Sequence, residues 1–322
     1  MSAPIYLHAA GGIGLQAAPV LDLQRVDVAK LEADAQPISL RELSKSLRIA
    51  MPRLASRFAE LAVIGARSCV NRLERPLPQA TPVYLATGLG DVARTDALYY
   101  QVMPPSNEMA SPAQFATSGN NMAAFFVAQQ LGLVSRNFTI SQQDLSLEHG
   151  LTIALDDLVA GGTTTALVGG VDETTLPRDF YVRRYPLCAD KYIGEGSAWL
   201  VLGTEPIGAI GEVIGVSIVS ATADDDWADC IASAMRSFIE SAGVAMLMPG
   251  ARISKIQVAA LLKRLPALVL REYRDFTGCL PTAAALAVVS TFANQPRMAA
   301  TYLHVNCDVA GRTGLIAWRV NR

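Results

Sequence analysis

Charged residues are scarce in this chain. They make up 17% of its 322 residues, and 27 lysines and arginines nearly balance 29 aspartates and glutamates, for a formal net charge of −2. No block of like charge stands out, so a surface that follows nucleic-acid phosphates is not expected. Because so little surface is charged while 51% of the residues are hydrophobic, we expect extensive contact with another subunit.

Histidine and cysteine are also few. The three histidines, at positions 8, 149 and 304, are expected to be structural residues. The five cysteines are odd in number and widely scattered, with no C-x-x-C pair. This usage argues against disulfides and against a zinc site, and it suits a reducing cytoplasm. We therefore expect a cytoplasmic protein with no bound metal.

Long apolar runs are missing as well. No stretch approaches the roughly 18 residues of a membrane span, so a spanning helix is not expected. The N-terminal segment MSAPIYLHAAGGIG has no basic region and is interrupted by glycines, so we expect no signal peptide. The glycine stretches near residues 11 and 88 lack the full G-x-G-x-x-G spacing and its acidic partner. A dinucleotide is therefore excluded, and no cofactor is expected.

Strands, helices and glycine turns alternate along the first two thirds of the chain. A Ser39–Glu42 capping box predicts one helix, and Pro52 predicts the first turn of another. Buried strands are predicted at TPVYLATGLG, NFTIS and TTTALVGGVDE, with helices over 119–131 and 145–161 between them. Such alternation is typical of a layered α/β fold.

From Asp224 the pattern starts again. Helices are predicted over 226–242, 254–264 and 281–292, with a strand over 267–271, before the final strands TYLHVNCDV and TGLIAWRV. The second series of elements is a shorter version of the first. We therefore predict a duplicated unit, with an N-terminal half over 1–223 and a C-terminal half over 224–322.

The segment NFTISQQDLSLEHG, residues 137–150, predicts a strand that turns sharply into a helix. In many α/β enzymes such a turn carries the nucleophile above the helix N-terminus. The residue at the apex here is Asp144. Two roles are open for its carboxylate. One is to cap helix 145–161, for which aspartate is among the best residues; the other is to mimic a charged intermediate held by the N–H groups of the helix end.

Taken in order, several segments resemble the β-ketoacyl synthases of the thiolase superfamily. These segments are VYLATGLGDV, NNMAAFFVAQQLGLVSRNFTIS, ALVGGVDE, GEGSAWLVLG, FTGCLPTAAALAVV and VAGRTGLIAWRV. The resemblance covers residues 80–322 well and the first 80 residues loosely. It implies a thiolase-like duplicated α/β fold with αβαβα layers.

The chemistry of that family implies a Cys thiolate that accepts the acyl chain, two His that stabilise a thioester carbonyl oxygen, and a nearby Lys. On this chain the Cys position falls on Asp144, the His positions on Pro249 and Cys279, and the Lys position on Arg274. A carboxylate is a poor acyl acceptor, because the mixed anhydride lies higher in energy than the thioester. Neither Pro249 nor Cys279 is a good hydrogen-bond donor. No catalytic residue is therefore expected.

Ketosynthase relatives without the Cys are known as chain-length factors. They pair with an active, Cys-containing ketosynthase and supply a wall of its acyl channel. The resemblance implies such a heterodimer, in an aryl polyene or another polyketide or fatty-acid-type pathway, with an acyl carrier protein that contacts mainly the partner.

The same resemblance places a group of residues near the predicted helix 119–131 at the acyl channel or the subunit interface. They are Ala110, Ala113, Gln114, Thr117, Asn121, Met122, Phe125 and Phe126. Counting back from Asn121 at helical spacing puts the first four on one face, and three of these four are small. The stretch Met109–Met122 is expected to set the length of the product.

Two other functions stay open. One is an independent thiolase-fold enzyme, a thioester hydrolase or decarboxylase in which Asp144 is the base that activates water. The other is a structural homodimer with no part in acyl chemistry. The enzyme would need a second polar catalytic group, and positions 249 and 279 do not provide one.

Overall fold

The computed structural model describes residues 4–14, 39–104, 106, 108–188, 194–221, 226–239, 244–293 and 299–321. Ten strands of this part of the chain form one mixed sheet in the order β3-β2-β4-β5-β1-β6-β10-β9-β7-β8. Their bounds are β1 Ile5–Ile13, β2 Val83–Ala86, β3 Asn137–Ile140, β4 Thr165–Asp172, β5 Gly196–Gly203, β6 Gly211–Val219, β7 Ala245–Pro249, β8 Leu268–Leu270, β9 Ala300–Cys307 and β10 Thr313–Val320.

The sheet consists of two halves with the same topology. In the first half, β2 pairs in parallel with β3 and β4, and β5 is antiparallel to β4 and β1. In the second half, β7 pairs in parallel with β8 and β9, and β10 is antiparallel to β9 and β6. A short antiparallel ladder between Ile5–Leu7 and Gly211–Val213 joins the halves. The repeated order agrees with the predicted duplication, while the boundary near residue 223 stays a prediction.

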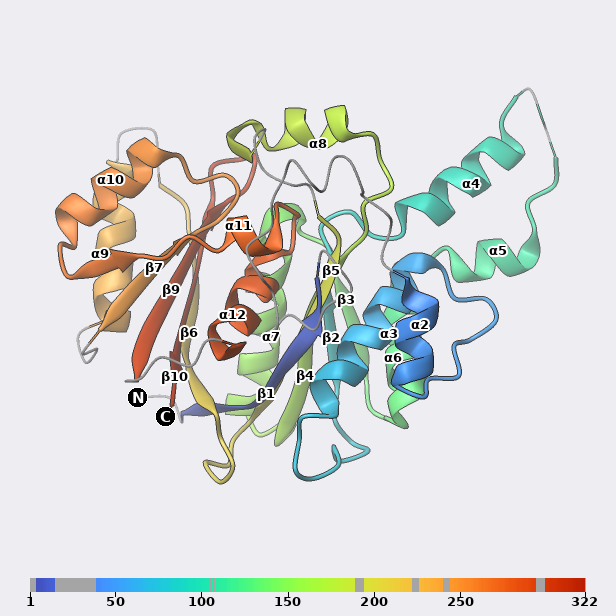
Figure 1. Ribbon diagram of the computed structural model, residues 1–322, viewed down its shortest axis with the longest axis horizontal. Helices are drawn as coiled ribbons and strands as arrows, with labels where there is room; N and C mark the ends of the chain where they lie inside the picture. The colour runs from blue at the N-terminus through green and yellow to red at the C-terminus, as the bar shows by residue number, and fades with distance from the viewer. Residues whose placement is uncertain are drawn as a thin grey trace.

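The helices lie in three layers around the two half-sheets (Figure 1). Helices α2, α3 and α6 cover the outer face of the first half, α9 and α10 cover the outer face of the second, and α7 and α12 lie between the halves. The α-helix bounds are α2 Leu40–Ser46, α3 Arg57–Val70, α4 Val92–Val102, α5 Pro112–Thr117, α6 Asn121–Leu131, α7 Ser146–Val159, α8 Arg178–Arg184, α9 Trp227–Ile239, α10 Lys255–Arg264, α11 Arg274–Thr277 and α12 Ala283–Ala293.

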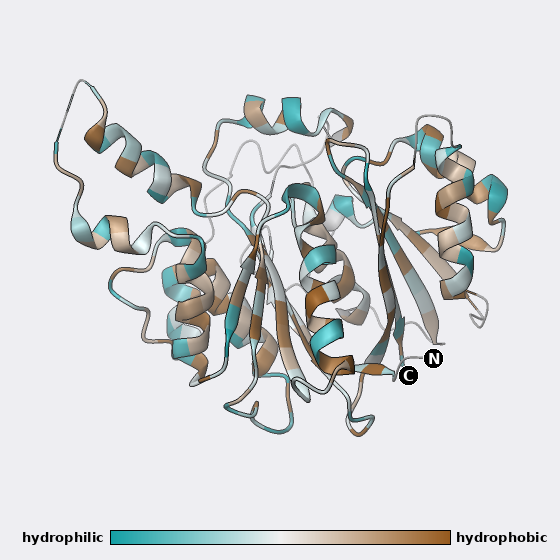
Figure 2. Cartoon of the chain, turned by 180° about the vertical axis from the view of Figure 1, so that it is seen from behind, coloured by the Kyte–Doolittle hydropathy of each residue, from teal (hydrophilic) through white to brown (hydrophobic). Residues whose placement is uncertain are grey.

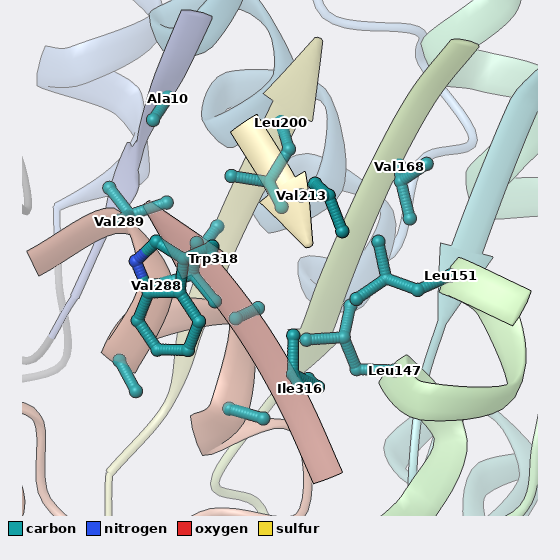
Figure 3. Close-up of a cluster of buried hydrophobic side chains, with 14 of the residues drawn as sticks. Ala10, Leu147, Leu151, Val168, Leu200, Val213, Val288, Val289, Ile316 and Trp318 are labelled. Carbon is teal, nitrogen blue, oxygen red and sulfur yellow. The ribbon is translucent and has the colours of Figure 1, made fainter. Parts of the chain in front are cut away.

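The predicted αβαβα layering is confirmed, and its physical basis is a sheet that buries both faces. In β2, Tyr84 and Ala86 pack in the middle core, whereas Val83 and Leu85 pack in the outer core with α3 and α6. Figure 3 shows the middle core, where Leu147 and Leu151 of α7 and Val288 and Val289 of α12 meet Ile316 and Trp318 of β10. The apolar side chains of this middle core fix α7, and with it the turn that precedes the helix.

Helices α4 and α5 project from the body as an arm (Figure 1). Helix α4 has no buried residue, and α5 buries only Thr117. Large apolar side chains of the arm are exposed instead, among them Tyr99, Tyr100, Met109 and Phe115. Figure 2 shows hydrophobic positions on this arm as well as along the strands of the core.

Several local predictions are corrected by the structure. The side chain of Ser39 makes no capping hydrogen bond, and the helix predicted from Pro52 begins at Arg57, where the Ser56 hydroxyl accepts from Ala59 N–H. The predicted helix 119–131 begins at Asn121. Residues 118–120 separate it from α5, so helical spacing does not continue from Asn121 back into the arm. Helices α4, α5, α8 and α11 were not predicted.

None of the helices in the described ranges combines the length and the apolar character that crossing a bilayer requires.

Candidate functional site

The predicted sharp turn lies between β3 and α7. After β3 ends at Ile140, residues Gln143–Leu145 form one turn of 3-10 helix, and Gln143 has a φ of +52°, which is uncommon for a residue other than glycine. The Ser146 hydroxyl holds this turn: it accepts from Gln142 N–H at 2.8 Å and lies 2.8 Å from the Thr87 carbonyl oxygen. The side chain of Asp144 is thereby turned into the interior.

Two further contacts brace the turn from the side of β2. At Gly88 an added Cβ would lie 2.0 Å from the Pro281 ring and 3.0 Å from the Gln143 carbonyl oxygen, so only glycine allows the segments to come this close. The buried carboxylate of Asp172 accepts from Gly88 N–H at 3.0 Å and from the Thr282 hydroxyl at 2.7 Å. Asp172 thus ties the loop after β2 to the segment before α12.

The carboxylate of Asp144 is enclosed by two guanidinium groups and a phenol. Its Oδ2 accepts from Arg252 Nε at 2.9 Å and from Arg184 Nη2 at 3.2 Å, and its Oδ1 accepts from the Tyr185 hydroxyl at 2.5 Å. The Asp144 side chain is 1% exposed, against 15% for Arg184 and 18% for Arg252. A buried carboxylate that accepts hydrogen bonds from two guanidinium groups and a hydroxyl group is well stabilised.

The three partners come from two distant parts of the chain. Arg184 is the last residue of α8 and Tyr185 follows it, whereas Arg252 lies three residues beyond β7. Both guanidinium groups also lie against the Tyr185 ring, 5.5 and 5.2 Å from its centroid. Burial and then the charge of Asp144 raise the pKa of Tyr185 well above its usual value, so the phenol stays a donor. We name Asp144, Arg184, Tyr185 and Arg252 the aspartate cluster.

The capping role considered for Asp144 is wrong. The residue that caps α7 is Leu145, and no side chain hydrogen-bonds to the first turn from the N-cap position. The carboxylate is instead held by two guanidinium groups, whose full positive charges attract it more strongly than the partial charges of helix N–H groups. Asn306 holds the backbone of Asp144 instead, since its Nδ2 donates to the Asp144 carbonyl oxygen at 3.0 Å.

The other three residues singled out by the resemblance, Pro249, Arg274 and Cys279, lie around the same site. Pro249 ends β7, and the loop that follows it carries Arg252 to Asp144. Cys279 is fully buried in one cluster with Tyr185 and Ala251. Arg274 pairs with Glu272 at 2.6 Å and donates to the Gly250 carbonyl oxygen at 3.3 Å, so it braces the loop from behind.

One prediction about the cysteines is wrong. Cys279 takes part in a disulfide, whereas Cys69, Cys230 and Cys307 are free thiols. Sequence spacing cannot reveal such a bond, because a disulfide requires a specific distance and orientation of two cysteines that only the folded chain sets. In the described part of the chain, no group of three or more His, Cys, Asp or Glu side chains is arranged to hold a metal ion.

A second buried polar group lies beneath the aspartate cluster, one helical turn along α7. Glu148 and His304 are both fully buried, with His304 Nδ1 at 3.8 Å from Glu148 Oε1, and His304 Nε2 is 2.9 Å from the Tyr273 hydroxyl. Neither carboxyl oxygen of Glu148 has a hydrogen-bond partner among the described residues. Burial, with a smaller effect of the Asp144 charge, raises the pKa of Glu148 to about 8, and burial lowers that of His304 to about 3.

The residues predicted for the acyl channel or the interface lie on two elements, helix α6 and the arm, and differ in their exposure. Phe125 is 44% exposed on α6, whereas Phe126 is buried in the outer core and Met122 packs against that core. On α5, Ala113 is exposed and Thr117 is buried. The remaining members of the set lie at the surface of the arm or of α6, with Ala110 and Gln114 half-buried and Asn121 exposed.

Sequence reasoning did not find Arg184, Tyr185, Arg252 or Asn306. The sequence did contain an indication for Arg252: it lies three residues after Pro249, the position that the resemblance pairs with the first catalytic His of ketosynthases. Arg184 and Tyr185 lie in a segment with no motif, and only the packing of α8 over the turn brings them to Asp144.

No protein-family profile and no curated protein sequence matches this chain. Solved structures do match over its whole length. The ishigamide ketosynthase/chain length factor superposes with a TM-score of 0.74 at 15% identity and covers 99% of this chain and 100% of that one. A type II polyketide synthase ketosynthase bound to a hexaketide, in complex with its acyl-carrier protein (AntDE:AntF), also gives a TM-score of 0.74, at 12% identity with both chains fully covered.

A β-ketoacyl synthase from Burkholderia phymatum STM815 gives a TM-score of 0.70 at 14% identity, again with both chains fully covered. The chain therefore has the thiolase-like fold of ketosynthases and chain length factors. At such low identity the match establishes the fold alone.

Replacing Asp144 with Asn should destabilise the protein by about 3–5 kcal/mol, because two partly buried guanidinium groups would lose their counter-charge. Urea unfolding followed by circular dichroism measures the change. Asp229→Asn is the matched control, since it removes an aspartate that pairs with Arg264 while 66% exposed, and its midpoint should barely move. Equal midpoints for the two variants would contradict a stabilising role of the aspartate cluster.

Glu148→Gln should become more stable than the wild type as the pH rises. Folded Glu148 keeps its proton up to about pH 8, whereas the unfolded side chain loses it near 4.5. The wild type therefore loses stability relative to the variant between these values, by about 1.4 kcal/mol per pH unit. Urea unfolding from pH 5 to 8 tests this, with the exposed Glu108→Gln as control. A difference that does not change with pH would contradict the buried, protonated state.

Proposed function

We propose that this chain is a catalytically incomplete ketosynthase-like subunit, a chain length factor that pairs with an active, Cys-containing ketosynthase. The observation that carries the proposal is the aspartate cluster. At the position that the resemblance assigns to the nucleophile, this chain has a carboxylate, and that carboxylate is 1% exposed and bound by Arg184, Arg252 and Tyr185. Such a group neither accepts an acyl chain nor leaves room for one.

The edge of the sheet supports the pairing. β3 is the terminal strand of the first half-sheet, and its only ladder among the described residues is with β2. An unpaired edge with apolar side chains invites another strand. Phe138 on β3 is 41% exposed, Val134 just before it is 78% exposed, and Phe125 on the adjacent α6 is 44% exposed. We propose that β3 pairs antiparallel with the equivalent strand of the ketosynthase across a pseudo-two-fold axis.

The arm supports the same partner. An 11-residue helix without a buried residue, such as α4, gains nothing from its own core. The exposed apolar residues of the arm (Tyr99, Tyr100, Met109 and Phe115) would become buried against a second subunit, as in large obligate interfaces. On this proposal the arm reaches the partner and forms part of the wall of its acyl channel, in a polyketide or polyene pathway such as aryl polyene synthesis, while the acyl carrier protein docks mainly on the partner.

The geometry does not favour the alternative in which Asp144 acts as a general base. A base must reach the proton it takes, directly or through one water. Both oxygens of Asp144 already accept hydrogen bonds from Arg184, Tyr185 and Arg252, and the side chain is almost inaccessible. For the same reason we do not propose hydrolase or decarboxylase activity.

Co-expression and reconstitution with a Cys-containing ketosynthase test the proposal. After incubation with an acyl carrier protein thioester, intact mass spectrometry should find the acyl adduct on the ketosynthase and none on this chain. The two chains should also co-purify. An acyl adduct on this chain, or a well-behaved monomer that ignores the ketosynthase, would contradict the proposal.

Two variants test whether β3 forms the interface with the ketosynthase. Phe138→Asp places a charge at the edge strand and should abolish co-purification. Ile256→Asp changes another exposed apolar residue, 83% exposed on α10 at the far end of the sheet, and should leave pairing intact. If both variants pair equally well, β3 is not the interface.

Product length should respond to the arm. Ala113 is exposed on α5, whereas Thr117 is buried and its hydroxyl donates to the Ala113 carbonyl oxygen at 2.9 Å, so Ala113→Phe changes the surface without breaking the fold. A phenyl ring in the channel wall should shorten the products of the reconstituted pair, since each methylene that can no longer be buried costs about 0.8 kcal/mol. Mass spectrometry of the products measures this. Ala259→Phe on α10 is the control, and unchanged lengths with Ala113→Phe would place the channel elsewhere.

A further inference from the structure

A pocket of about 300 Å³ lies at the opposite end of the sheet from Asp144. Strand β4 shows the separation: Thr165 at its start lines the pocket, and Asp172 at its end braces the turn around Asp144. The walls are the loop 72–78 after α3, the connection 204–210 between β5 and β6, and His8 of β1. Both loops lie at the lower end of the molecule in Figure 1, whereas α8 lies at the upper end. We name this the basal pocket.

Local irregularities of the sheet direct an imidazole into the basal pocket. The register of β1 against β5 shifts between Leu7 and Ala9, so His8 is the extra residue of a β-bulge. Bulges re-aim side chains and are frequent near sites. Across from it, Gly203 leaves room for the ring, because a Cβ there would lie 2.9 Å from His8 Nε2. The backbones of Glu205 and Gly208 hydrogen-bond to the ring.

The pocket carries unpaired charges of both signs. Arg72, Glu74 and Arg75 lie on one wall and Glu205 on the other, near His8. Within the described ranges none of these four side chains has an ion-pair or hydrogen-bond partner, although Arg72 acts electrostatically on the buried Cys69 thiol and Glu205 on His8. Burial lowers the pKa of His8, so near pH 7 the two arginines and two glutamates balance. Leu73, Leu77, Ile207 and Ile210 provide an aliphatic surface between the walls.

We propose that the basal pocket binds a small zwitterion with an apolar side chain, of the class of the hydrophobic amino acids. Guanidinium groups of Arg72 and Arg75 suit the carboxylate, and Glu205 beside His8 suits the ammonium group. The side chain then packs on the aliphatic surface. A volume of about 300 Å³ is at the lower limit of ligand pockets, which fits a molecule of this size. A lone carboxylate or a lone amine would leave charges of one sign unmatched.

Isothermal titration of the full chain, with its partner subunit where the pair is needed for solubility, tests the proposal. The probes are L-phenylalanine and L-leucine, each compared with the matched compound that lacks the amine (3-phenylpropionate, 4-methylpentanoate) or the carboxylate (2-phenylethylamine, 3-methylbutylamine). At least one amino acid should bind with saturation, at least tenfold more tightly than either of its matched compounds.

Variants assign the two ends of the ligand. The double variant Arg72→Gln/Arg75→Gln should reduce the affinity for the amino acid to that of the amine, and Glu205→Gln should reduce it to that of the carboxylate. All three side chains are exposed, so the fold should persist, which circular dichroism checks. Lys263→Gln, an exposed cation on α10, should bind like the wild type.

Two results would overturn the proposal: no saturable binding of either amino acid, or equal affinity for an amino acid and one of its matched compounds. Neither result affects the proposed pairing with a ketosynthase, because the basal pocket and the β3 edge are separate surfaces and co-purification is measured independently.

Discussion

The ion pairs of Asp144 are the interaction on which the candidate site depends. Burying a carboxylate is costly unless cations and donors replace the lost water. Here the replacement comes from the end of α8, where Arg184 is the last helical residue and Tyr185 follows it, and from the loop after β7, which supplies Arg252. The carboxylate therefore links the N-terminal half, the helix above the sheet and the C-terminal half. An uncharged residue at this position would leave two guanidinium groups without a counter-charge.

Two other buried carboxyl groups near the turn, Asp172 and Glu148, are also governed by the donors around them. Asp172 is buried, and burial raises its pKa to about 6 although several donors oppose that shift. Those donors belong to the loop after β2 and to the segment before α12. Glu148, by contrast, has no such donors and keeps its proton. Two carboxyl groups within one turn of each other on the chain thus have different surroundings: Asp144 accepts hydrogen bonds from two guanidinium groups and a phenol, whereas Glu148 has no hydrogen-bond partner among the described residues.

The middle layer of the molecule is complete, whereas its first edge is not. Helices α7 and α12 are packed on both sides by strands, so the position of the turn around Asp144 does not require another subunit. The strand β3 and the arm leave apolar side chains in water, and a second subunit is the simplest means of covering them. In the proposed partner role, the packed middle layer holds the turn around Asp144 in place, and the exposed apolar side chains of β3 and the arm contact the second subunit.

The amino-acid sequence by itself determined the layered α/β fold, the duplicated order of elements and the sharp turn with Asp144 at its apex. These features depend on local periodicity and on glycine and proline positions, which act within a few residues. The basal pocket, the disulfide of Cys279 and the partners of Asp144 were decided only by the tertiary structure. Arg184 and Arg252 are 40 and 108 residues from Asp144. Side chains so far apart in sequence meet only when the strands and helices that carry them have packed, and no local pattern encodes that meeting.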